Sequence, residues 1–465
     1  MLPRTNMIRS FDVFDTLFAR RYVNSNIIWD SMERDCAIEG FAQHRRAADT
    51  GGRNLKQIYQ AMAADGHILE EDIDSFCAVE LLAEKSLIFP IKENLDKVRD
   101  GDLLVSDMYM QGPDILNLVR SVGMDKQVTI YQSNGDKATG AFWDRMKGIL
   151  DLEYHLGDNA HSDVQMPLSR GFNAVHYPNT NSMTEIEEYL ISIDLNHLGL
   201  LLREIRLRNY EPEYAPFLEI ANQKNLLLIF LFCEMLHRKY GNRQIVFLGR
   251  DCQLTQRIYN TYYNVRSYYL PFSREVAFKD PDSAVHYLKT HAPEGSVLVD
   301  ISSTGKTWEV ICNKHPFDVE VFIHSDTYWY SKEKPVVPET FGYIHTNSVI
   351  GGTSIILEIF NCGDHGKVKN IDVINGVALC SFGETELTEE LIRVIHKPVN
   401  DAVDLSTHYS KITFELSKLD SDTLSVLSAN LLVNISNTPR EQLNINGVLD
   451  EFDRKEEQYL DNVSN

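Results

Sequence analysis

The chain has 465 residues, of which 43% are hydrophobic and 24% are charged, a composition typical of globular proteins. At roughly 150 residues per domain, this length predicts two or three domains. The 45 basic and 67 acidic residues give a net charge of −22, which argues against a nucleic-acid partner and against electrostatic docking on an anionic membrane.

Membrane and export signals are not evident in the sequence. The longest apolar run, residues 226–233, is far shorter than the ~20 residues of a membrane-spanning helix, and we interpret it as part of a buried core helix. The first residues show no long apolar region and no small-residue cleavage site of a signal peptide. The seven cysteines are scattered and include no CxxC pair. We therefore expect reduced thiols and a cytoplasmic protein.

The first part of the chain has an α/β pattern. Residues 8–13 form a short apolar strand, and residues from about 27 to 87 carry helical apolar spacing without a strand signal. Strand-like runs then return at residues 103–105, 128–130, 154–156 and 174–176. This alternation predicts a doubly wound parallel sheet in a domain of residues 1–182, with a helical insertion at about residues 20–90.

A second α/β pattern follows a helical bridge that begins at residue 183. Its strand-like runs are residues 244–248, 267–270, 296–299 and 319–323. We expect a second doubly wound parallel-sheet domain that, with its leading helices, covers residues 183–385. The last residues, 386–465, are polar with helical spacing and are expected to form a helical appendage.

Polar side chains follow the strands of the first predicted domain. They are Asp12, Asp15, Ser106, Lys137, Asp158 and Asp163. A single Asp at a strand end is usually a turn residue or a helix cap. Loops that follow successive parallel strands meet at one edge of the sheet, however, and that edge is where such sheets bind ligands. The set therefore predicts one site.

This set suits phosphate transfer to water. Asp12 would attack phosphorus as a nucleophile and form an aspartyl phosphate. Ser106 and Lys137 would hold the phosphoryl oxygens and offset their charge. Oxygen ligands for Mg²⁺ would come from Asp12, Asp158, Asp163 and a backbone carbonyl near Phe14.

The same residues resemble the haloacid dehalogenase superfamily, which consists mostly of Mg²⁺-dependent phosphatases, over about residues 7–180. The resemblance implies that the helical insertion is a cap that closes over the substrate. The superfamily's phosphatases carry a second Asp two places after the nucleophile as a general acid, and Phe14 stands there instead. Either Asp15 takes this role, or the domain is a weak phosphatase, or its reaction differs, or the site has lost its activity.

The stretch VLVDISSTGKTW, residues 297–308, ends like a P-loop, but Asp300 stands where the P-loop pattern requires its first Gly. A strand, an acid and small residues before a helix can instead present backbone N–H groups to a phosphate. We predict that Asp300 binds ribose hydroxyls. The predicted phosphate loop consists of Ser302, Ser303, Thr304, Gly305, Lys306 and Thr307.

This loop resembles the phosphoribosyl-diphosphate loop of type I phosphoribosyltransferases, and the resemblance covers about residues 240–330. Arg250 and Asp251 follow a strand in the place of the diphosphate loop, and Arg274 follows the next strand, where it would bind a second phosphate group. Taken singly, each Arg would be read as a surface ion pair. The loop departs from the pattern because Asp300 is its only acid and Lys306 replaces a small residue.

Elsewhere in the second half, Glu358 is read as a helix-surface residue, with a catalytic base as the alternative. Together the two resemblances imply a bifunctional enzyme like those of bacterial capsule and O-antigen assembly. The second domain would transfer ribose 5-phosphate from phosphoribosyl diphosphate to a glycan hydroxyl, and the first would then remove the 5-phosphate with Mg²⁺. Association with polysaccharide-assembly enzymes is expected.

Two alternatives remain open at the level of sequence. The first is a simple Mg²⁺-dependent sugar-phosphate or nucleotide phosphatase whose C-terminal domain recognises the substrate. The second is a binding protein that senses phosphoribosyl diphosphate and has lost its chemistry. Release of diphosphate separates the bifunctional enzyme from both alternatives, and release of phosphate separates the phosphatase from the sensor.

Overall fold

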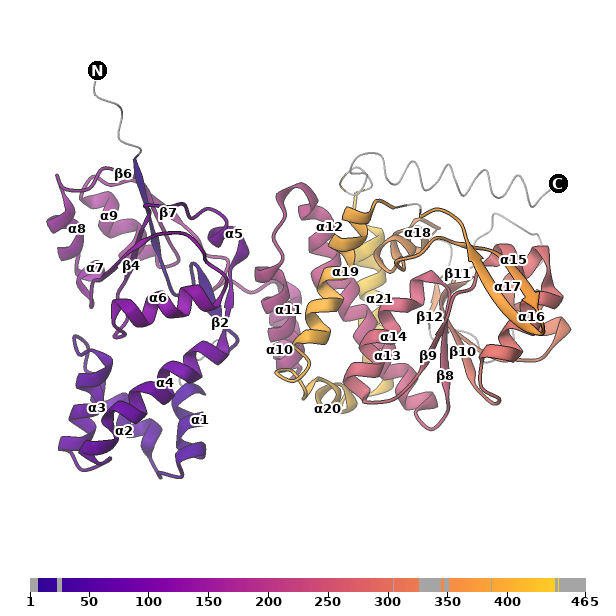
Figure 1. Cartoon of the computed structure of the whole chain (residues 1–465), viewed down its shortest axis with the longest axis horizontal. Coiled ribbons are helices and arrows are strands. Elements are labelled where there is room, and N and C mark those ends of the chain that lie inside the picture. Colours follow the sequence, from indigo (N-terminus) through magenta and orange to yellow (C-terminus); the bar gives the residue numbers. More distant parts are fainter. Residues whose placement is uncertain are drawn as a thin grey trace, which may run out of the picture. The chain divides into compact units, whose positions relative to one another are not determined.

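The computed structural model of the protein describes residues 7–22, 27–303, 305–325, 344–346, 351–385, 387–439 and 442. The chain divides into two compact units, residues 1–188 and 189–465 (Figure 1). Each unit contains a parallel sheet with helices, so the predicted α/β class is confirmed. The division lies at residue 188 where the sequence suggested 182, and the described part of the expected appendage belongs to the second unit.

The sheet of the first unit has the strand order β5-β4-β1-β6-β7, and every neighbouring pair is parallel. Its strands are β1 (Ile8–Asp12), β4 (Leu103–Ser106), β5 (Thr129–Gln132), β6 (Leu152–Gly157) and β7 (Ala174–His176). The order reverses between β1 and β6, because the chain first builds outward to β5 and then crosses to the other side. In doubly wound sheets the ligand binds beyond the carboxyl ends of the strands at such a reversal.

Short helices connect the strands of this sheet. They are α5 (Lys92–Leu95), α6 (Gly112–Ser121), α7 (Asp136–Thr139), α8 (Ala141–Met146) and α9 (Met166–Ser169), with a π-helical turn at Ala160–Gln165, and α10 (Glu185–Ser192) follows the last strand. Helix α6 buries Ile115, Leu118 and Val119, which lie on one face at helical spacing. The helices therefore cover the sheet with their apolar sides.

The predicted insertion is present between β2 (Phe18–Arg20) and β3 (Ile88–Pro90), two antiparallel strands that pair Arg20 with Ile88. It contains α1 (Ile27–Cys36), α2 (Phe41–Ala48), α3 (Leu55–Ala64), a 3₁₀ turn (Glu70–Asp72) and α4 (Ile73–Leu87). Asn54 and Gln57 form a capping box that fixes the start of α3. The insertion has its own buried core around Phe41 and Tyr59, and Figure 1 shows it as a helical lobe beside the sheet.

The sheet of the second unit has the order β12-β11-β10-β8-β9, also parallel throughout. Its strands are β8 (Ile245–Leu248), β9 (Tyr268–Leu270), β10 (Val297–Ser303), β11 (Asp318–Ser325) and β12 (Ile344–Thr346). Here the order reverses between β8 and β10. Strand β8, which precedes Arg250 and Asp251, and strand β10, which contains Asp300, are therefore neighbours at the expected ligand position, and Arg274 follows β9 on the other side of β8.

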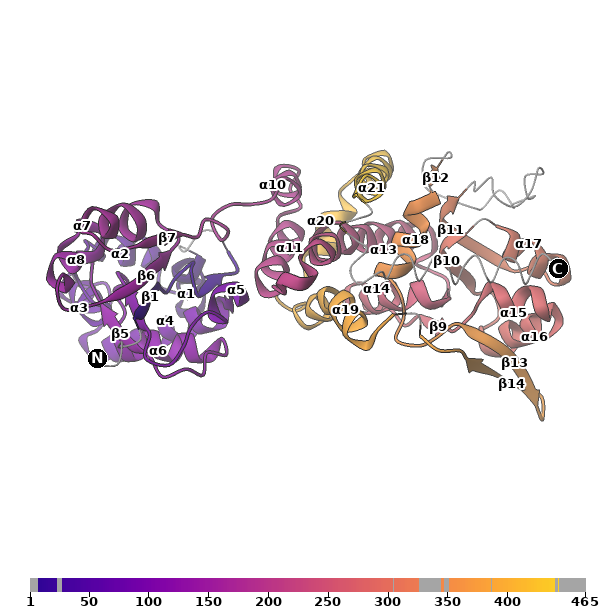
Figure 2. The same cartoon turned by 90° about the horizontal axis from the view of Figure 1, so that it is seen from above.

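Helices surround this second sheet (Figure 2). Those before β10 are α11 (Asn196–Arg208), α12 (Ala215–Glu219), α13 (Leu226–Tyr240), α14 (Gln253–Tyr263), α15 (Arg274–Lys279) and α16 (Pro281–His291). Those after it are α17 (Lys306–Lys314), α18 (Gly351–Phe360), α19 (Glu389–Asp404), α20 (Ile412–Ser417) and α21 (Ser421–Ser436). A hairpin of β13 (Val368–Ile374) and β14 (Val377–Phe382) packs on α15 and α16.

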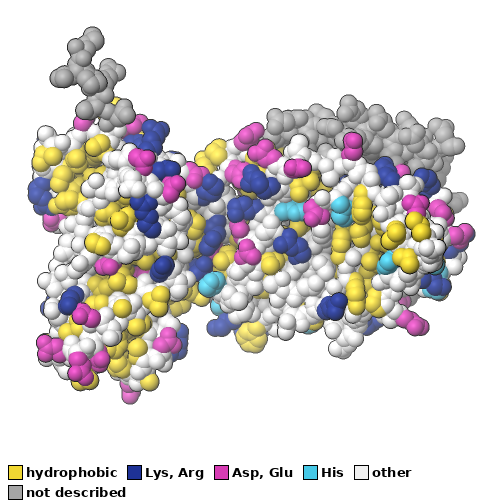
Figure 3. Space-filling view, viewed as in Figure 1, with side chains coloured by type: hydrophobic (Ala, Val, Ile, Leu, Met, Phe, Trp, Pro, Cys, Tyr) yellow, Lys and Arg dark blue, Asp and Glu magenta, His cyan; other side chains and the backbone are white. Residues whose placement is uncertain are grey.

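Helix α13 contains the longest apolar run of the sequence and is buried from Leu226 to Leu236, as predicted for a core helix. The C-terminal helices α19 and α21 pack against α14 and α13 respectively, which explains why they belong to the second unit. Within the described residues, no helix combines the length and the apolar character that crossing a membrane requires. On the face seen in Figure 3, acidic and basic side chains are interspersed.

Candidate active sites

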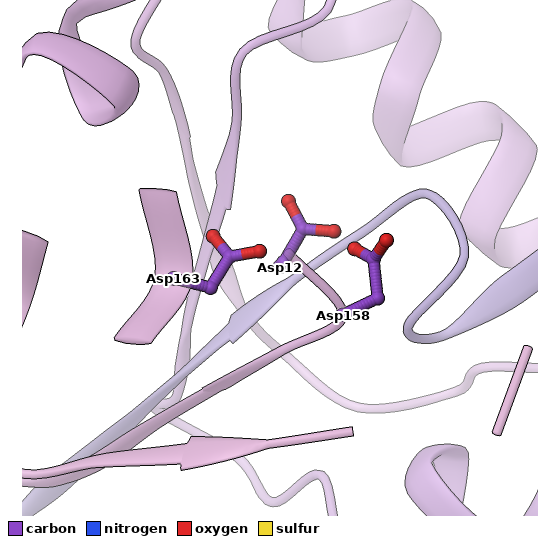
Figure 4. Close-up of side chains that lie close together, drawn as sticks. All are labelled: Asp12, Asp158 and Asp163. Atoms are coloured by element: carbon purple, nitrogen blue, oxygen red, sulfur yellow. The ribbon is translucent and has the colours of Figure 1, made fainter. Parts of the chain in front are cut away.

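Three acidic side chains meet at the carboxyl edge of the first sheet. Asp12 ends β1, Asp158 follows β6, and Asp163 lies in the π-helical turn behind it. One carboxylate oxygen of each lies within 4.8 Å of those of the other two. Figure 4 shows Asp12 between the other two acids, with all three carboxylates pointing to the same side. The structure thus brings together the acids that the sequence assigned to one site.

Lys137 reaches into this cluster from α7. Its Nζ donates to Oδ1 of Asp12 and lies 2.7 Å from Oδ1 of Asp163, and its side chain is buried. Asp107 holds the preceding loop, because its carboxylate accepts backbone N–H groups from Gly135 at 3.2 Å, Lys137 at 3.2 Å and Ala138 at 3.1 Å. Asp107 was not predicted, although it directly follows the predicted Ser106.

Asp163 is held more tightly than a simple metal ligand would need to be. Its Oδ2 accepts the backbone N–H of Asn159 at 3.0 Å, and its Oδ1 lies 3.3 Å from Nε2 of the buried His155. A Cβ at Gly157 would stand 2.4 Å from its Cγ, so this close approach requires glycine. Both oxygens of Asp163 accept hydrogen bonds, so Asp163 also fixes Lys137 and the loop.

Thr16 links the other two acids. Its hydroxyl accepts the backbone N–H of Asp158 at 3.1 Å and lies 3.1 Å from Oδ2 of Asp12 and 3.4 Å from Oδ1 of Asp158. Because a hydroxyl has one proton, it donates to one carboxylate at a time. Sequence reasoning missed Thr16 and His155, although both lie in the stretches that contain the predicted acids.

The electrostatics of this cluster favour a divalent cation. Burial raises the pKa of Asp12 well above its ordinary value in spite of Lys137, with further repulsion from Asp163 and Asp158. Burial and the charges of Asp15 and Asp163 raise the pKa of Asp158 to about 6. Burial also opposes ionisation of Asp163, but the hydrogen bond with His155 and the charge of Lys137 outweigh it and lower this pKa. Lys137 pairs with the buried Asp12 and Asp163, whereas Asp158 is half-buried, and hard oxygen donors of this kind suit Mg²⁺.

The remaining predicted residues of this site lie around the cluster. Ser106 is buried one residue beyond Val105, which pairs with Asp12 in the sheet, and its Oγ accepts the N–H of Met108 at 3.3 Å. Asp15 has a φ of 57° and donates its N–H to the carbonyl of Phe18 at 2.8 Å. The ring of Phe14 packs on Phe18, with centroids 4.6 Å apart. The proton-transfer role of Asp15 and the ligand role of the Phe14 carbonyl stay predictions.

A pocket opens between β8 and β10 of the second unit and holds about 860 Å³ of space, part of it open to solvent. Its lining consists of Leu248, Gly249, Arg250, Asp251, Phe272, Ser273, Arg274, Glu275, Asp300, Ser302, Ser303, Thr307, Trp308, Glu358 and Lys367. The predicted phosphate loop thus contributes Ser302, Ser303 and Thr307 to the pocket. Gly305 and Lys306 are not in the lining, and Thr304 lies outside the described residues.

Asp300 is held by Trp308, whose Nε1 donates to its Oδ2 at 3.0 Å. The indole stacks on Phe272, with ring centroids 5.8 Å apart and planes inclined by 14°. Burial raises the pKa of Asp300 to about 7, and the hydrogen bond with Trp308 opposes this shift. Phe272 was not predicted, because its role becomes visible only when β9 and α17 come together.

The turn after β8 requires glycine. Gly249 has a φ of 81°, and a Cβ there would stand 3.0 Å from Oδ1 of Asp251. Burial, followed by the charges of Asp300 and Glu358, raises the pKa of Asp251 well above its ordinary value. Glu358 also lines this pocket, and no sequence pattern distinguished this position from an ordinary helix surface.

The lining mixes cations and acids. Arg250, Arg274 and Lys367 supply positive charge for an anionic group, and acids and hydroxyls nearby can bind the hydroxyls of a sugar. Lys367 was missed because it comes from just before β13, far along the chain. No protein-family model and no curated protein matches this chain. The chemistry of both sites therefore has to be inferred from their residues.

Proposed function

We propose that the protein is a bifunctional enzyme that transfers ribose 5-phosphate from phosphoribosyl diphosphate to a glycan hydroxyl and then removes the 5-phosphate. The observation that carries the proposal is the convergence of Asp12, Lys137 and Asp158 at the reversal of the first sheet. A buried carboxylate with a lysine beside it, at a ligand-binding edge, suits nucleophilic attack on a phosphate group.

In the phosphatase step, a carboxylate oxygen of Asp12 forms a bond to phosphorus, and the bond from phosphorus to the sugar oxygen breaks. The sugar oxygen takes a proton, for which Asp15 is the proposed donor. Water then attacks phosphorus, the bond to Asp12 breaks and inorganic phosphate leaves, while the proton of the water returns to Asp15. Lys137 offsets the negative charge on the phosphoryl oxygens throughout.

Mg²⁺ is the proposed cofactor of this first site. Oxygen atoms of Asp12 and Asp158 would hold it, with Asp163 and the carbonyl of Phe14 as the further predicted ligands. When bound, the cation would supply positive charge to offset that of the phosphoryl group. It would also relieve the repulsion among the three acids, which Lys137 alone does not balance.

In the transfer step, the acceptor oxygen forms a bond to C1 of ribose, and the bond from C1 to the diphosphate oxygen breaks. Arg250, Arg274 and Lys367 would hold the phosphate groups. Asp300 would orient the ribose hydroxyls, and Glu358 would accept the proton of the acceptor hydroxyl. The pocket is open to solvent, and its cations, acids and hydroxyls match the groups of a sugar phosphate.

The two reactions follow one another, and removal of the phosphate makes the overall conversion effectively irreversible. Phosphoribosyl diphosphate and a glycan acceptor are the proposed substrates, polysaccharide-assembly enzymes are the proposed partners, and the cytoplasm is the proposed location. The net charge of −22 is consistent with these partners rather than with nucleic acid.

The proposal is tested by incubating the protein with phosphoribosyl diphosphate, Mg²⁺ and candidate glycan acceptors. Mass spectrometry should detect a pentose adduct on an acceptor, together with released diphosphate and phosphate. Phosphate release from sugar phosphates without any adduct or diphosphate would replace the proposal with a simple phosphatase. Binding of phosphoribosyl diphosphate without either product would replace it with the sensor.

A further inference from the structure

A buried carboxylate lies at the centre of the insertion. Glu80 of α4 is fully buried, and each of its oxygens accepts two hydrogen bonds. Arg45 donates to both oxygens, at 2.9 and 2.8 Å. The hydroxyls of Tyr59 and Tyr109 donate to one oxygen each, at 2.6 and 2.7 Å. Burial beside Glu80 raises the pKa of both tyrosines, so both hydroxyls keep their protons and act as donors.

One of these donors comes from outside the insertion. Tyr59 and Arg45 belong to α3 and α2, whereas Tyr109 lies in the loop that directly follows Ser106, the last residue of β4. The carbonyl of Tyr109 accepts the N–H of Leu55 at 2.9 Å, and its ring lies 4.8 Å from the Arg45 guanidinium. The insertion is therefore tied to this loop by side chain and backbone together.

The loop passes this restraint on to Ser106. Met108, which precedes Tyr109, donates its N–H to Oγ of Ser106 at 3.3 Å and accepts a hydrogen bond from the side chain of Gln132 at 3.3 Å. A second hydrogen bond joins the insertion to the loop before α7, the helix that carries Lys137. In it, Asn134 donates its side-chain N–H to the carbonyl of Gly52 at 2.9 Å. The insertion thus contacts both loops that are predicted to hold the phosphoryl group.

We propose that Tyr109 is a positioning residue that couples the placement of the insertion to Ser106, so that the phosphate site is complete only while the insertion is docked. This inference rests on the proposed phosphatase function of the first site. Hydrogen bonds to a charged acceptor are about twice as strong as neutral ones, which suits Glu80 as the anchor of the tie. Through this coupling the insertion would affect the chemical step directly, in addition to closing over the substrate.

The chain offers a matched control. Tyr109→Phe and Tyr59→Phe each remove one hydroxyl that donates to the same carboxylate, but only Tyr109 connects the insertion to the Ser106 loop. If the hydroxyls serve only to satisfy Glu80, the two variants should behave alike. If Tyr109 positions Ser106, only Tyr109→Phe should slow the chemistry.

The experiment compares both variants of the full chain with wild type, using p-nitrophenyl phosphate and Mg²⁺. We expect Tyr109→Phe to lower kcat for phosphate release by at least ~10-fold with a smaller change in KM, because misplaced groups lose orientation. Tyr59→Phe should stay within about 2-fold of wild type. Equal losses in the two variants, or no loss in either, would overturn the proposal.

A second measurement keeps this test separate from that of the proposed function. Amide hydrogen exchange of residues 106–111 should become at least ~10-fold faster in Tyr109→Phe and stay near wild type in Tyr59→Phe, because loss of the tie permits local opening. This readout needs no activity. If wild type releases no phosphate, the proposed function fails while exchange still tests the tie. Unchanged exchange in a folded Tyr109→Phe protein would exclude the tie itself.

Discussion

At the scale of single residues, the reactivity proposed for Asp12 depends on how its two oxygens are held. Lys137 donates to one oxygen and Thr16 lies within hydrogen-bond distance of the other. These contacts orient a carboxylate that burial would otherwise favour in its neutral form. A phosphate group that enters the site would compete with Asp12 for the Lys137 ammonium and so free one oxygen for attack.

Replacement of Asp12 by Asn tests the nucleophile directly. Asp12→Asn keeps the shape of the side chain but removes the charged oxygen, so we expect phosphate release to fall by at least ~10³-fold. The measurement is the steady-state rate with a sugar phosphate and Mg²⁺. A variant that keeps most of the wild-type rate would show that Asp12 has been misassigned.

Asp15 can be tested by the choice of leaving group. If it is the general acid, Asp15→Asn should slow hydrolysis of alkyl phosphates by about 10²-fold or more, and that of p-nitrophenyl phosphate far less, because the aryl oxygen needs little protonation. The comparison of the two substrates is the readout. Equal losses would instead point to a structural role, since Asp15 lies in a turn with a φ of 57°.

Asp300 makes a prediction about pH and stability. Folding raises its pKa from 3.8 to about 7, so the folded state binds this proton more tightly than the unfolded chain. The resulting stabilisation is full below the ordinary pKa and is lost as the pH rises through about 7. The Tm of Asp300→Asn minus the Tm of wild type should therefore be larger at about pH 8 than at about pH 5. The same Tm difference at both pH values would contradict this assignment.

At the scale of elements, local patterns predicted the insertion and every strand of the two sheets except β12. Strands β1, β4, β8 and β10 are short runs that are mostly buried on both faces, a situation that produces nearly continuous apolar sequence. The order of the strands was not predicted, because pairing depends on contacts between distant segments. For that reason the reversals between β1 and β6 and between β8 and β10 became known only from the structure.

The candidate sites were predictable to a similar extent. Acids at strand ends, such as Asp12 and Asp158, could be found from their position alone. Asp107 and Trp308 could not, because each acts by holding another predicted residue, and such a hydrogen bond has no sequence pattern. Lys306 was expected in the second site because residues 302–307 resemble a phosphoribosyl-diphosphate loop. In the structure it begins α17 and does not line the pocket.

At the scale of the whole molecule, the two sites lie in different units, and we expect them to fail independently. Asp12→Asn should still yield a glycosyl product, but one that keeps its 5-phosphate. Asp300→Asn should lower transfer by at least ~10²-fold, because the ribose loses its orientation, and should still dephosphorylate a supplied ribose-5-phosphate glycoside.

Product mass distinguishes these outcomes, since the wild-type and Asp12→Asn adducts should differ by one phosphate group. Wild-type protein incubated with compounds that accept no ribosyl group serves as the blank for the adduct mass. If a folded Asp12→Asn protein forms no adduct, the two sites are coupled. If wild type forms none with any acceptor, the transferase part of the proposal is to be dropped.

The antiparallel strands β2 and β3 have a consequence for how the protein can evolve. They bring Arg20 and Ile88 side by side, so the chain enters the helical insertion and leaves it at nearly one point. Paired strands lie only about 5 Å apart, a gap that a two-residue turn closes. The whole lobe is therefore one continuous segment whose two ends lie together. Its replacement would leave the acids of the sheet in place and, under the proposed function, would alter which phosphate esters reach them.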